Sequence, residues 1–181
     1  MASTTVTLEP HPTSAGSFVR SLRATVSRPA EGMLAVVYTL EGALDALRIP
    51  LTRPANVSDR LWEHTCFELF IARPGGAAYH ELNFAPYGAW AVYAFDRYRV
   101  RSRDVAPAIE PSIHLRHADT KLELEAQVEL ARLSREYASG SLALGVSAVI
   151  EDTEGNLSYW SIAHPQPKPD FHDREAFTLA L

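Results

Sequence analysis

The segment Leu61–Tyr98, LWEHTCFELFIARPGGAAYHELNFAPYGAWAVYAFDRY, contains three aromatic-rich strand patterns separated by two turn signals. Successive side chains of a strand point to opposite faces of its sheet. One face of the first pattern is therefore apolar from Phe67 to Ile71, whereas the other carries a tryptophan, a histidine and a carboxylate in line, at Trp62, His64 and Glu68. This polar face is a candidate binding surface.

The second and third patterns predict that the segment continues as an antiparallel meander. Residues 73–76 form a hairpin connector, Tyr79–Phe84 resumes the alternation, and residues 89–95 follow a second turn at residues 85–88. Tyr79, Glu81 and Asn83 share one face of the second strand. If the hairpin pairs that face with Trp62, His64 and Glu68, a polar pocket with aromatic walls results.

The rest of the chain also has the pattern of short strands broken by proline, glycine and polar turns. A short helix is expected at residues 131–138, closed by Gly140. The arginine-rich stretch at 97–103 favours an exposed edge strand or a solvated loop over an anion site. Further strands are predicted at residues 4–9, 17–27, 33–40, 46–49, 121–130, 141–150, 157–162 and 177–181.

This arrangement predicts an all-β protein, a β-sandwich of two antiparallel sheets with about ten to twelve strands and at most one or two short helices. The 181 residues fit a single domain spanning 1–181. The composition, 46% hydrophobic and 22% charged, is that of a globular protein that can bury a core without disulfides.

Composition also excludes several classes of function. A net charge of −5 argues against nucleic-acid binding, and no run approaches the roughly 18 apolar residues of a membrane helix. Cys66 is the only cysteine, so no intrachain disulfide can form. The amino terminus lacks the basic and apolar regions of a secretory signal, and a cytoplasmic location is therefore expected.

No catalytic or metal-binding signature is present. The sequence lacks a nucleophile elbow, a P-loop, a dinucleotide fingerprint, HExxH and paired CxxC, so neither a catalytic residue, a metal site nor a cofactor is predicted. The acidic turn at residues 151–156 lacks the EF-hand pattern, which favours a solvated turn, although calcium binding there stays open. Cys66 is interpreted as a buried, inert thiol.

Three segments carry a family resemblance: LWEHTCFELFI, YHELNFAPYGAWAVYAFDRYR and SYWSIAHPQPKPDFHDREAFTLAL. Together they resemble bacterial DOMON-like proteins related to family 9 carbohydrate-binding modules. The resemblance covers the chain from about Leu61 onward, whereas earlier residues match only in strand character. It implies a β-sandwich whose relatives bind sugars or, in other branches, haem. The methionine and histidine pair of the haem branch is not matched, since Met1 and Met33 are the only methionines.

In the sugar-binding relatives, two tryptophans hold the ligand while a carboxylate and amide or guanidinium groups bond its hydroxyls. The resemblance therefore implies Trp62 and Trp160 as two facing platforms, with Glu68 and Asn83 as polar contacts. This is chemically reasonable, because an aromatic face packs on the C–H face of a pyranose while its hydroxyls need directional partners. The proline-rich tail, either a binding segment or a structural strap, would bring Asp170 or His172 beside Trp160.

The combined hypothesis is a non-catalytic module that binds a small polar ligand, a saccharide or glycan fragment. Its expected ligand-binding residues are Trp62, His64, Glu68, Tyr79, Glu81, Asn83, Trp160, Asp170 and His172. Two alternatives remain open: an enzyme with Glu68 and Glu81 as acid and base, and a protein-interaction module with an exposed aromatic face. Each tryptophan also has a structural interpretation as core, strongest for Trp90.

Overall fold

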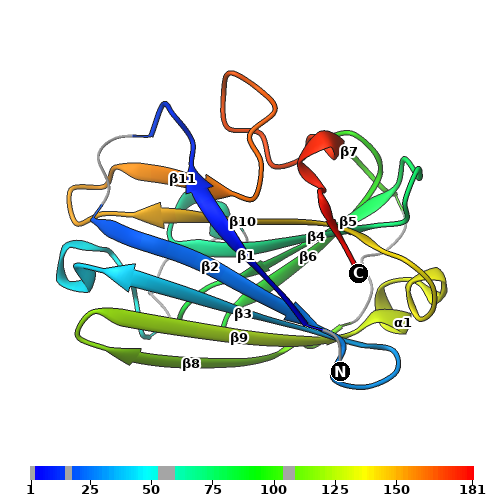
Figure 1. The fold of residues 1–181 in the computed structure, drawn as a ribbon, viewed down its shortest axis with the longest axis horizontal. Coiled ribbons are helices and arrows are strands. Elements are labelled where there is room, and N and C mark those ends of the chain that lie inside the picture. Colours follow the sequence, from blue (N-terminus) through cyan, green and yellow to red (C-terminus); the bar gives the residue numbers. More distant parts are fainter. Residues whose placement is uncertain (1–2, 15–17, 53–59, 104–108) are drawn as a thin grey trace.

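The structure, a computed structural model, describes residues 3–14, 18–52, 60–103 and 109–181. Its strands build a sandwich of two antiparallel layers (Figure 1), which confirms the predicted fold class. The described residues contain twelve strands. One of the layers, called sheet B below, is formed largely by the meander from which the fold was predicted.

The first layer, sheet A, contains the amino-terminal strands and a later hairpin. Its spatial order is β1 (Ser3–Pro10), β2 (Val19–Ser27), β3 (Met33–Gly42), β9 (Lys121–Glu129) and β8 (Ser112–Ala118). Strand β9 was predicted as the cleanest alternation in the chain, and its residues from Leu122 to Val128 are alternately buried and partly exposed. This is the pattern of a strand with one wet face.

The second layer, sheet B, has the order β7 (Val100–Arg101), β6 (Trp90–Arg97), β5 (Tyr79–Phe84), β4 (Cys66–Ala72), β10 (Ala143–Glu151) and β11 (Leu157–Ser161). The short strand β12 (Leu179–Ala180) pairs with the start of β10. Strand β1 joins the two layers, because it pairs with β2 from Ser3 to Leu8 and with β11 at Glu9 and Pro10.

The main core lies between the sheets and depends on the alternation of β4. Phe67, Leu69 and Ile71 all point inward and are at most 1% exposed. From sheet A, the buried hydroxyl of Tyr38 donates a hydrogen bond of 2.6 Å to the backbone oxygen of Glu68. The apolar face predicted for β4 therefore lies in the core, and one side chain ties the layers together through the backbone of β4.

A second, smaller core covers part of the outer face of sheet B. It is formed by Phe70, Ala72, Tyr79, Phe95, Ala176 and Phe177. The last two come from the carboxyl-terminal segment, which includes the 3-10 turn η4 (Arg174–Ala176). Gly145 permits this packing, because a Cβ at that position would lie 2.9 Å from the ring of Phe177. The segment is thereby held against β10 and β4.

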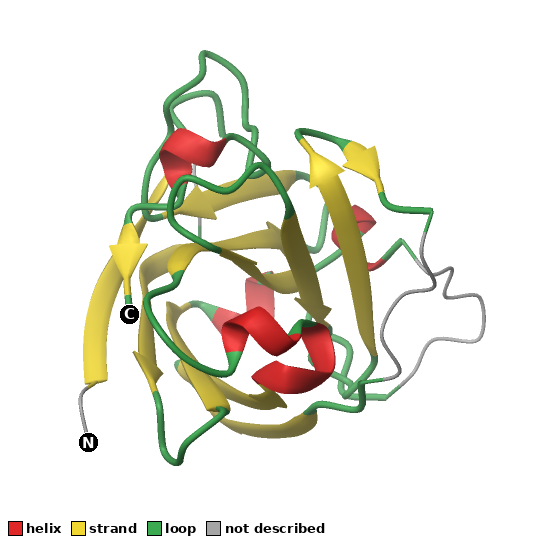
Figure 2. Cartoon of the chain, turned by 90° about the vertical axis from the view of Figure 1, so that its right-hand side faces the viewer, coloured by secondary structure: helices red, strands yellow, loops and turns green. Residues whose placement is uncertain are grey.

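The helical elements are short. The predicted helix is confirmed as α1 (Leu130–Leu133) followed by the 3-10 turn η3 (Arg135–Tyr137), and Figure 2 looks onto the end of the sandwich where they lie. Gly140 follows with a positive φ of 78°, as expected for a glycine after a helix. Two further 3-10 turns are η1 (Leu44–Ala46) and η2 (Leu61–Glu63). Among the described residues, no helix combines the length and apolar character needed to cross a bilayer.

Several predicted boundaries were wrong. Residues 46–49 form no strand, because η1 precedes a single bridge between Leu47 and Asp152. Strand β4 begins at Cys66, after the turn η2, so alternation does not extend back to Trp62. Strand β8 was missed, since its side chains are mostly exposed and its pattern is only weakly apolar. The predicted start at Ser17 lies outside the described residues.

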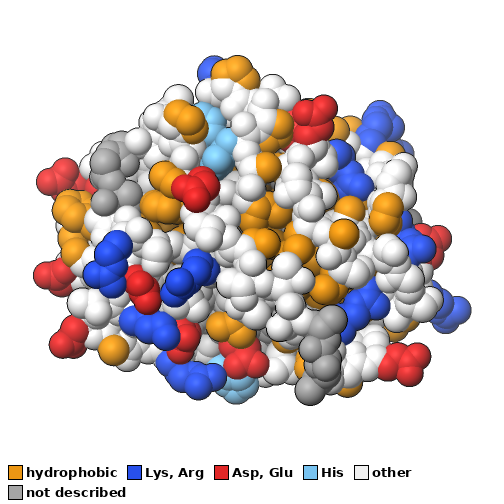
Figure 3. All heavy atoms as spheres, in the orientation of Figure 1, with side chains coloured by type: hydrophobic (Ala, Val, Ile, Leu, Met, Phe, Trp, Pro, Cys, Tyr) orange, Lys and Arg blue, Asp and Glu red, His pale blue; other side chains and the backbone are white. Residues whose placement is uncertain are grey.

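The arginine-rich stretch was correctly interpreted as an edge, because β7 lies at the end of sheet B and is exposed. Figure 3 shows acidic and basic side chains interspersed over one face of the molecule. No large single-sign patch dominates that face, in keeping with the modest net charge of −5.

Tyr38→Phe tests the bond that joins the two layers. Removing the hydroxyl leaves the ring in the core but deletes one buried hydrogen bond, so the free energy of unfolding should fall by about 1 kcal/mol. Tyr38→Ala also leaves a cavity and should cost about 3–5 kcal/mol. Chemical denaturation measures both, and an unchanged stability of Tyr38→Phe would show that this bond contributes nothing.

Candidate ligand-binding site

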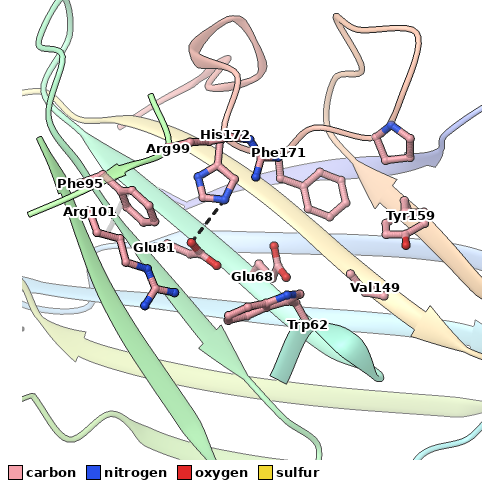
Figure 4. A pocket seen from close by; sticks show the side chains of 11 residues that line it. Trp62, Glu68, Glu81, Phe95, Arg99, Arg101, Val149, Tyr159, Phe171 and His172 are labelled. Atoms are coloured by element: carbon pink, nitrogen blue, oxygen red, sulfur yellow. Dashed lines mark ion pairs between the residues drawn. The ribbon is translucent and has the colours of Figure 1, made fainter. Parts of the chain in front are cut away.

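A cavity of about 480 Å³ opens on the outer face of sheet B, beside the second core (Figure 4). Its floor comes from β4, β5 and β10, and its walls come from η2, β6, β7, β11 and the carboxyl-terminal segment. The lining residues are Trp62, Glu68, Glu81, Phe95, Arg99, Arg101, Val149, Tyr159, Pro169, Phe171 and His172.

Two buried carboxyl groups form the floor. Glu68 lies opposite Asn83 on β5, and Glu81 lies opposite Phe70 on β4, so the two glutamates are diagonal neighbours on one face of the sheet. Glu68 is 3% exposed and Glu81 is 5% exposed. Carboxylates are seldom buried to this extent without a partner. Their burial therefore marks this part of the sheet as unusual.

The surroundings hold the pKa of both carboxyls above its ordinary value. Burial raises the pKa of Glu68 well above that value, the charge of Glu81 raises it further, and the hydroxyl of Ser147 and the charge of Arg99 partly oppose them. Burial also raises the pKa of Glu81. There the opposing influences are a hydrogen bond of 2.8 Å from the Asn83 amide and the charges of Arg101 and Arg99. Glu68 is thus the more readily protonated member of the pair.

His172 stands over Glu81 and is neutral at pH 7. Burial, helped by the charge of Arg99, lowers its pKa to about 4. The Tyr79 hydroxyl accepts from the backbone N–H of Arg99 and is hydrogen-bonded to Nδ1 of His172 at 2.8 Å. The other ring nitrogen of His172, Nε2, is 3.6 Å from Oε2 of Glu81. Figure 4 shows this contact as a dashed line.

Aromatic side chains wall the cavity on two sides. The half-buried indole of Trp62 lies edge-on to the ring of Tyr93, with centroids 5.7 Å apart. Across Glu68 in Figure 4 is Phe171, whose ring centroid lies 6.2 Å from that of Tyr159. A carboxyl floor between aromatic walls suits a ligand with both apolar and hydrogen-bonding faces.

Two arginines complete the rim. Arg99, at a positive φ of 53°, pairs with Asp170 at 2.8 Å, and the Tyr98 hydroxyl donates to the same carboxylate at 2.5 Å. Burial opposes ionisation of Asp170, but these two contacts outweigh it and lower its pKa. The Arg101 guanidinium lies 4.1 Å from the centroid of the Tyr93 ring. The Asp170 contacts join the β6–β7 turn to the carboxyl-terminal segment.

Several of the site residues expected from sequence come together here. Trp62, Glu68, Glu81 and His172 line the cavity. Tyr79, Asn83 and Asp170 do not line it, but each bonds a residue that does: His172, Glu81 and Arg99, respectively. The predicted pairing of the β4 and β5 polar faces is confirmed by the register of Glu68 and Asn83.

Trp160 is a correction to the expected site. It lies opposite Ala148 in the β10–β11 pair, faces the main core and is only 4% exposed. Its neighbour Tyr159 lies opposite Val149, and both of these line the cavity. The two positions differ by one residue and so point to opposite faces of the sheet. The expected pair of facing tryptophans is therefore absent, and Phe171 and Tyr159 form the wall opposite Trp62.

His64 was also placed wrongly. Because η2 interrupts the strand pattern, its exposed imidazole does not line the cavity and lies 2.8 Å from Glu151, which also pairs with Arg48. Trp90, interpreted as the likeliest core tryptophan, is instead 38% exposed. Cys66 is fully buried, as predicted.

Sequence reasoning missed seven lining residues. Two of them, Val149 and Tyr159, were detectable in principle, because they share the sheet face of Glu68 once the strand pairs are known. Arg99 and Arg101 belong to the stretch that was correctly interpreted as an edge strand. That interpretation did not indicate that the same two residues also line the cavity. The others are Phe95, Pro169 and Phe171, of which the last two reach the site only through the path of the tail.

The acidic turn at residues 151–156 is organised by its own hydrogen bonds. The Asp152 carboxylate accepts from the backbone N–H groups of Glu154 and Asn156 and from the Asn156 amide. Within the described residues, no group of three or more histidine, cysteine or acidic side chains is arranged to hold a metal ion.

Comparison with known proteins identifies solved structures that have a similar fold. No family model matches the chain, and no curated protein matches it. A protein from Bacteroides uniformis thought to bind carbohydrate has a similar crystal structure, with a TM-score of 0.63 and 14% identity over 97% of this chain and 85% of that one. A family 9 carbohydrate-binding module from Caldicellulosiruptor kristjanssonii, solved with cellotriose, gives a TM-score of 0.55 and 10% identity over 87% and 72% of the two chains. At these identities the likeness shows that the chain has the same sandwich fold.

Proposed function

We propose that this protein binds a saccharide in the cavity of sheet B without altering it chemically. The observation that carries the proposal is the union of a half-buried indole wall at Trp62 with a floor of two buried carboxyls. An indole packs on the C–H face of a sugar ring, while carboxyl, imidazole and guanidinium groups bond its hydroxyls. The module solved with cellotriose shares the fold, which lends the proposal further support.

The state of the carboxyls suits this role. The pKa of both carboxyls is raised, more strongly for Glu68, and a protonated carboxyl donates one hydrogen bond whereas an ionised one only accepts. Together with the imidazole of His172 and the guanidinium of Arg99, the cavity offers both donors and acceptors. A ring of hydroxyl groups, each both donor and acceptor, needs such a mixed set.

The arrangement favours binding over hydrolysis. A glycoside hydrolase places an acid and a second carboxylate on either side of the scissile bond. Here Glu68 and Glu81 lie side by side on neighbouring strands of one floor. The pKa of Glu68 is raised by burial and by the charge of Glu81, and that of Glu81 is raised by burial. The alternative function, a protein-interaction module, is supported by three exposed apolar side chains at the β6–β7 edge: Trp90, Tyr98 and Val100.

Calorimetric titration of neutral, amino and acidic sugars, with cellotriose included, tests saccharide binding. Trp62→Ala should weaken the binding of any positive ligand about tenfold or more, because it removes the apolar contact of one indole. Trp90→Ala is the matched control, since this exposed tryptophan does not line the cavity. Equal affinity of wild type and Trp62→Ala, or release of cleaved sugar during the titration, would contradict the proposal.

Glu68→Gln separates a binding role from a structural one. Because the folded-state pKa of Glu68 is raised, the folded protein holds a proton that the unfolded chain loses, so this group costs stability as pH rises above the ordinary glutamate pKa. The variant should therefore be about 1 kcal/mol more stable than wild type near neutral pH, with the gain vanishing in acid.

Denaturation at several pH values measures this difference. Glu31→Gln, the same change at an exposed position outside the cavity, should leave stability unchanged at each pH. A Glu68→Gln protein that is less stable than wild type throughout would indicate that the carboxylate is needed for the fold.

A further inference from the structure

The charges around the cavity do not balance when all of its carboxyls are ionised. Arg99 is already paired with Asp170 at 2.8 Å. The charge of Arg101 acts on Glu81 and partly offsets the rise in its pKa, and Nε2 of His172 lies 3.6 Å from the same carboxylate. The three carboxylates of Glu68, Glu81 and Asp170 thus face two guanidiniums, those of Arg99 and Arg101, and a neutral imidazole. One negative charge is left without a partner.

Glu68 is the residue that holds this charge. It is 3% exposed, it points into the cavity, and it makes no ion pair within the part of the chain that the structure describes. The opposing charge that acts on it is that of Arg99, which is already paired with Asp170. A buried carboxylate without a counter-ion either takes up a proton or receives a cation from outside.

The walls around Glu68 suit a cation. The indole of Trp62 lies on one side of Glu68 and the ring of Phe171 lies on the other, as Figure 4 shows. Aromatic faces attract an ammonium group, most strongly when it is withdrawn from water. Opposite charge at the floor and aromatic rings at the sides are the two elements by which proteins hold an organic cation.

Given the proposed function, on which this step rests, we infer that the ligand is a saccharide that carries a protonated amino group, a hexosamine unit, with its ammonium on Glu68. One positive charge on the ligand cancels the one negative charge left in the cavity. In the free protein the raised pKa of Glu68 favours a proton on this carboxyl, and an ammonium group bound there displaces that proton into solvent.

Calorimetry with matched sugars tests this at about pH 6, where a sugar amine is largely protonated. Glucosamine and galactosamine are each compared with the N-acetyl sugar and the parent hexose, which have the same ring without the charge. For at least one series, the amino sugar should bind about tenfold or more tightly than both neutral forms. Measured in two buffers of different ionisation enthalpy, its binding should release about one proton, and that of the hexose none.

Variants locate the charge that the ammonium meets. Glu68→Gln should abolish both the preference for the amino sugar and the proton release, whereas Glu31→Gln, an exposed position outside the cavity, should keep both. The inference is overturned, with saccharide binding intact, if the neutral sugars bind as tightly as the amino sugars. It is also overturned if the preference survives Glu68→Gln. If no sugar binds at all, the proposed function fails and this inference fails with it.

Discussion

The alternation of β4 is the constraint on which both the core and the candidate site depend. Phe67, Leu69 and Ile71 are held inside the sandwich by its main core, so Glu68 and Phe70 must point outward. A slip of one residue in register would bring Glu68 into the apolar core and expel three large side chains. The free energy of packing on one face therefore fixes the position of the carboxyl on the other.

The carboxyl-terminal segment covers part of the outer face of sheet B. Phe177 packs over Gly145, and together with Phe70 and Tyr79 it builds the second core. This packing places His172 over Glu81, and Asp170 on Arg99 adds a tie to the β6–β7 turn. The segment is thus a structural strap that also forms one wall of the cavity.

The alternation of apolar and polar residues in the sequence predicted those features of the fold and of the site that depend on a single strand or on one hairpin. The inward face of β4 and the shared face of Glu68, Glu81 and Asn83 follow from period two and from one hairpin register. The prediction for Trp160 was wrong because the face on which it lies depends on the pairing of β10 with β11. No pattern within β4 and β5 specifies that pairing. The prediction for His64 was wrong because the 3-10 turn η2 precedes β4, so the alternation of side chains along β4 does not extend back to this residue.

The structure also separates what fixes the position of Glu68 from what sets its charge. Its backbone is paired with β5 and β10 and bonded by Tyr38, so the sandwich holds it in place whatever its protonation state. Its side chain lies in a cavity whose other charges are largely matched among themselves. A fold stabilised only by its own contacts has no need of a carboxyl there, since an apolar or amide side chain would be buried at less cost. The cost of burying Glu68 is consequently in keeping with the ligand-binding role proposed for this cavity.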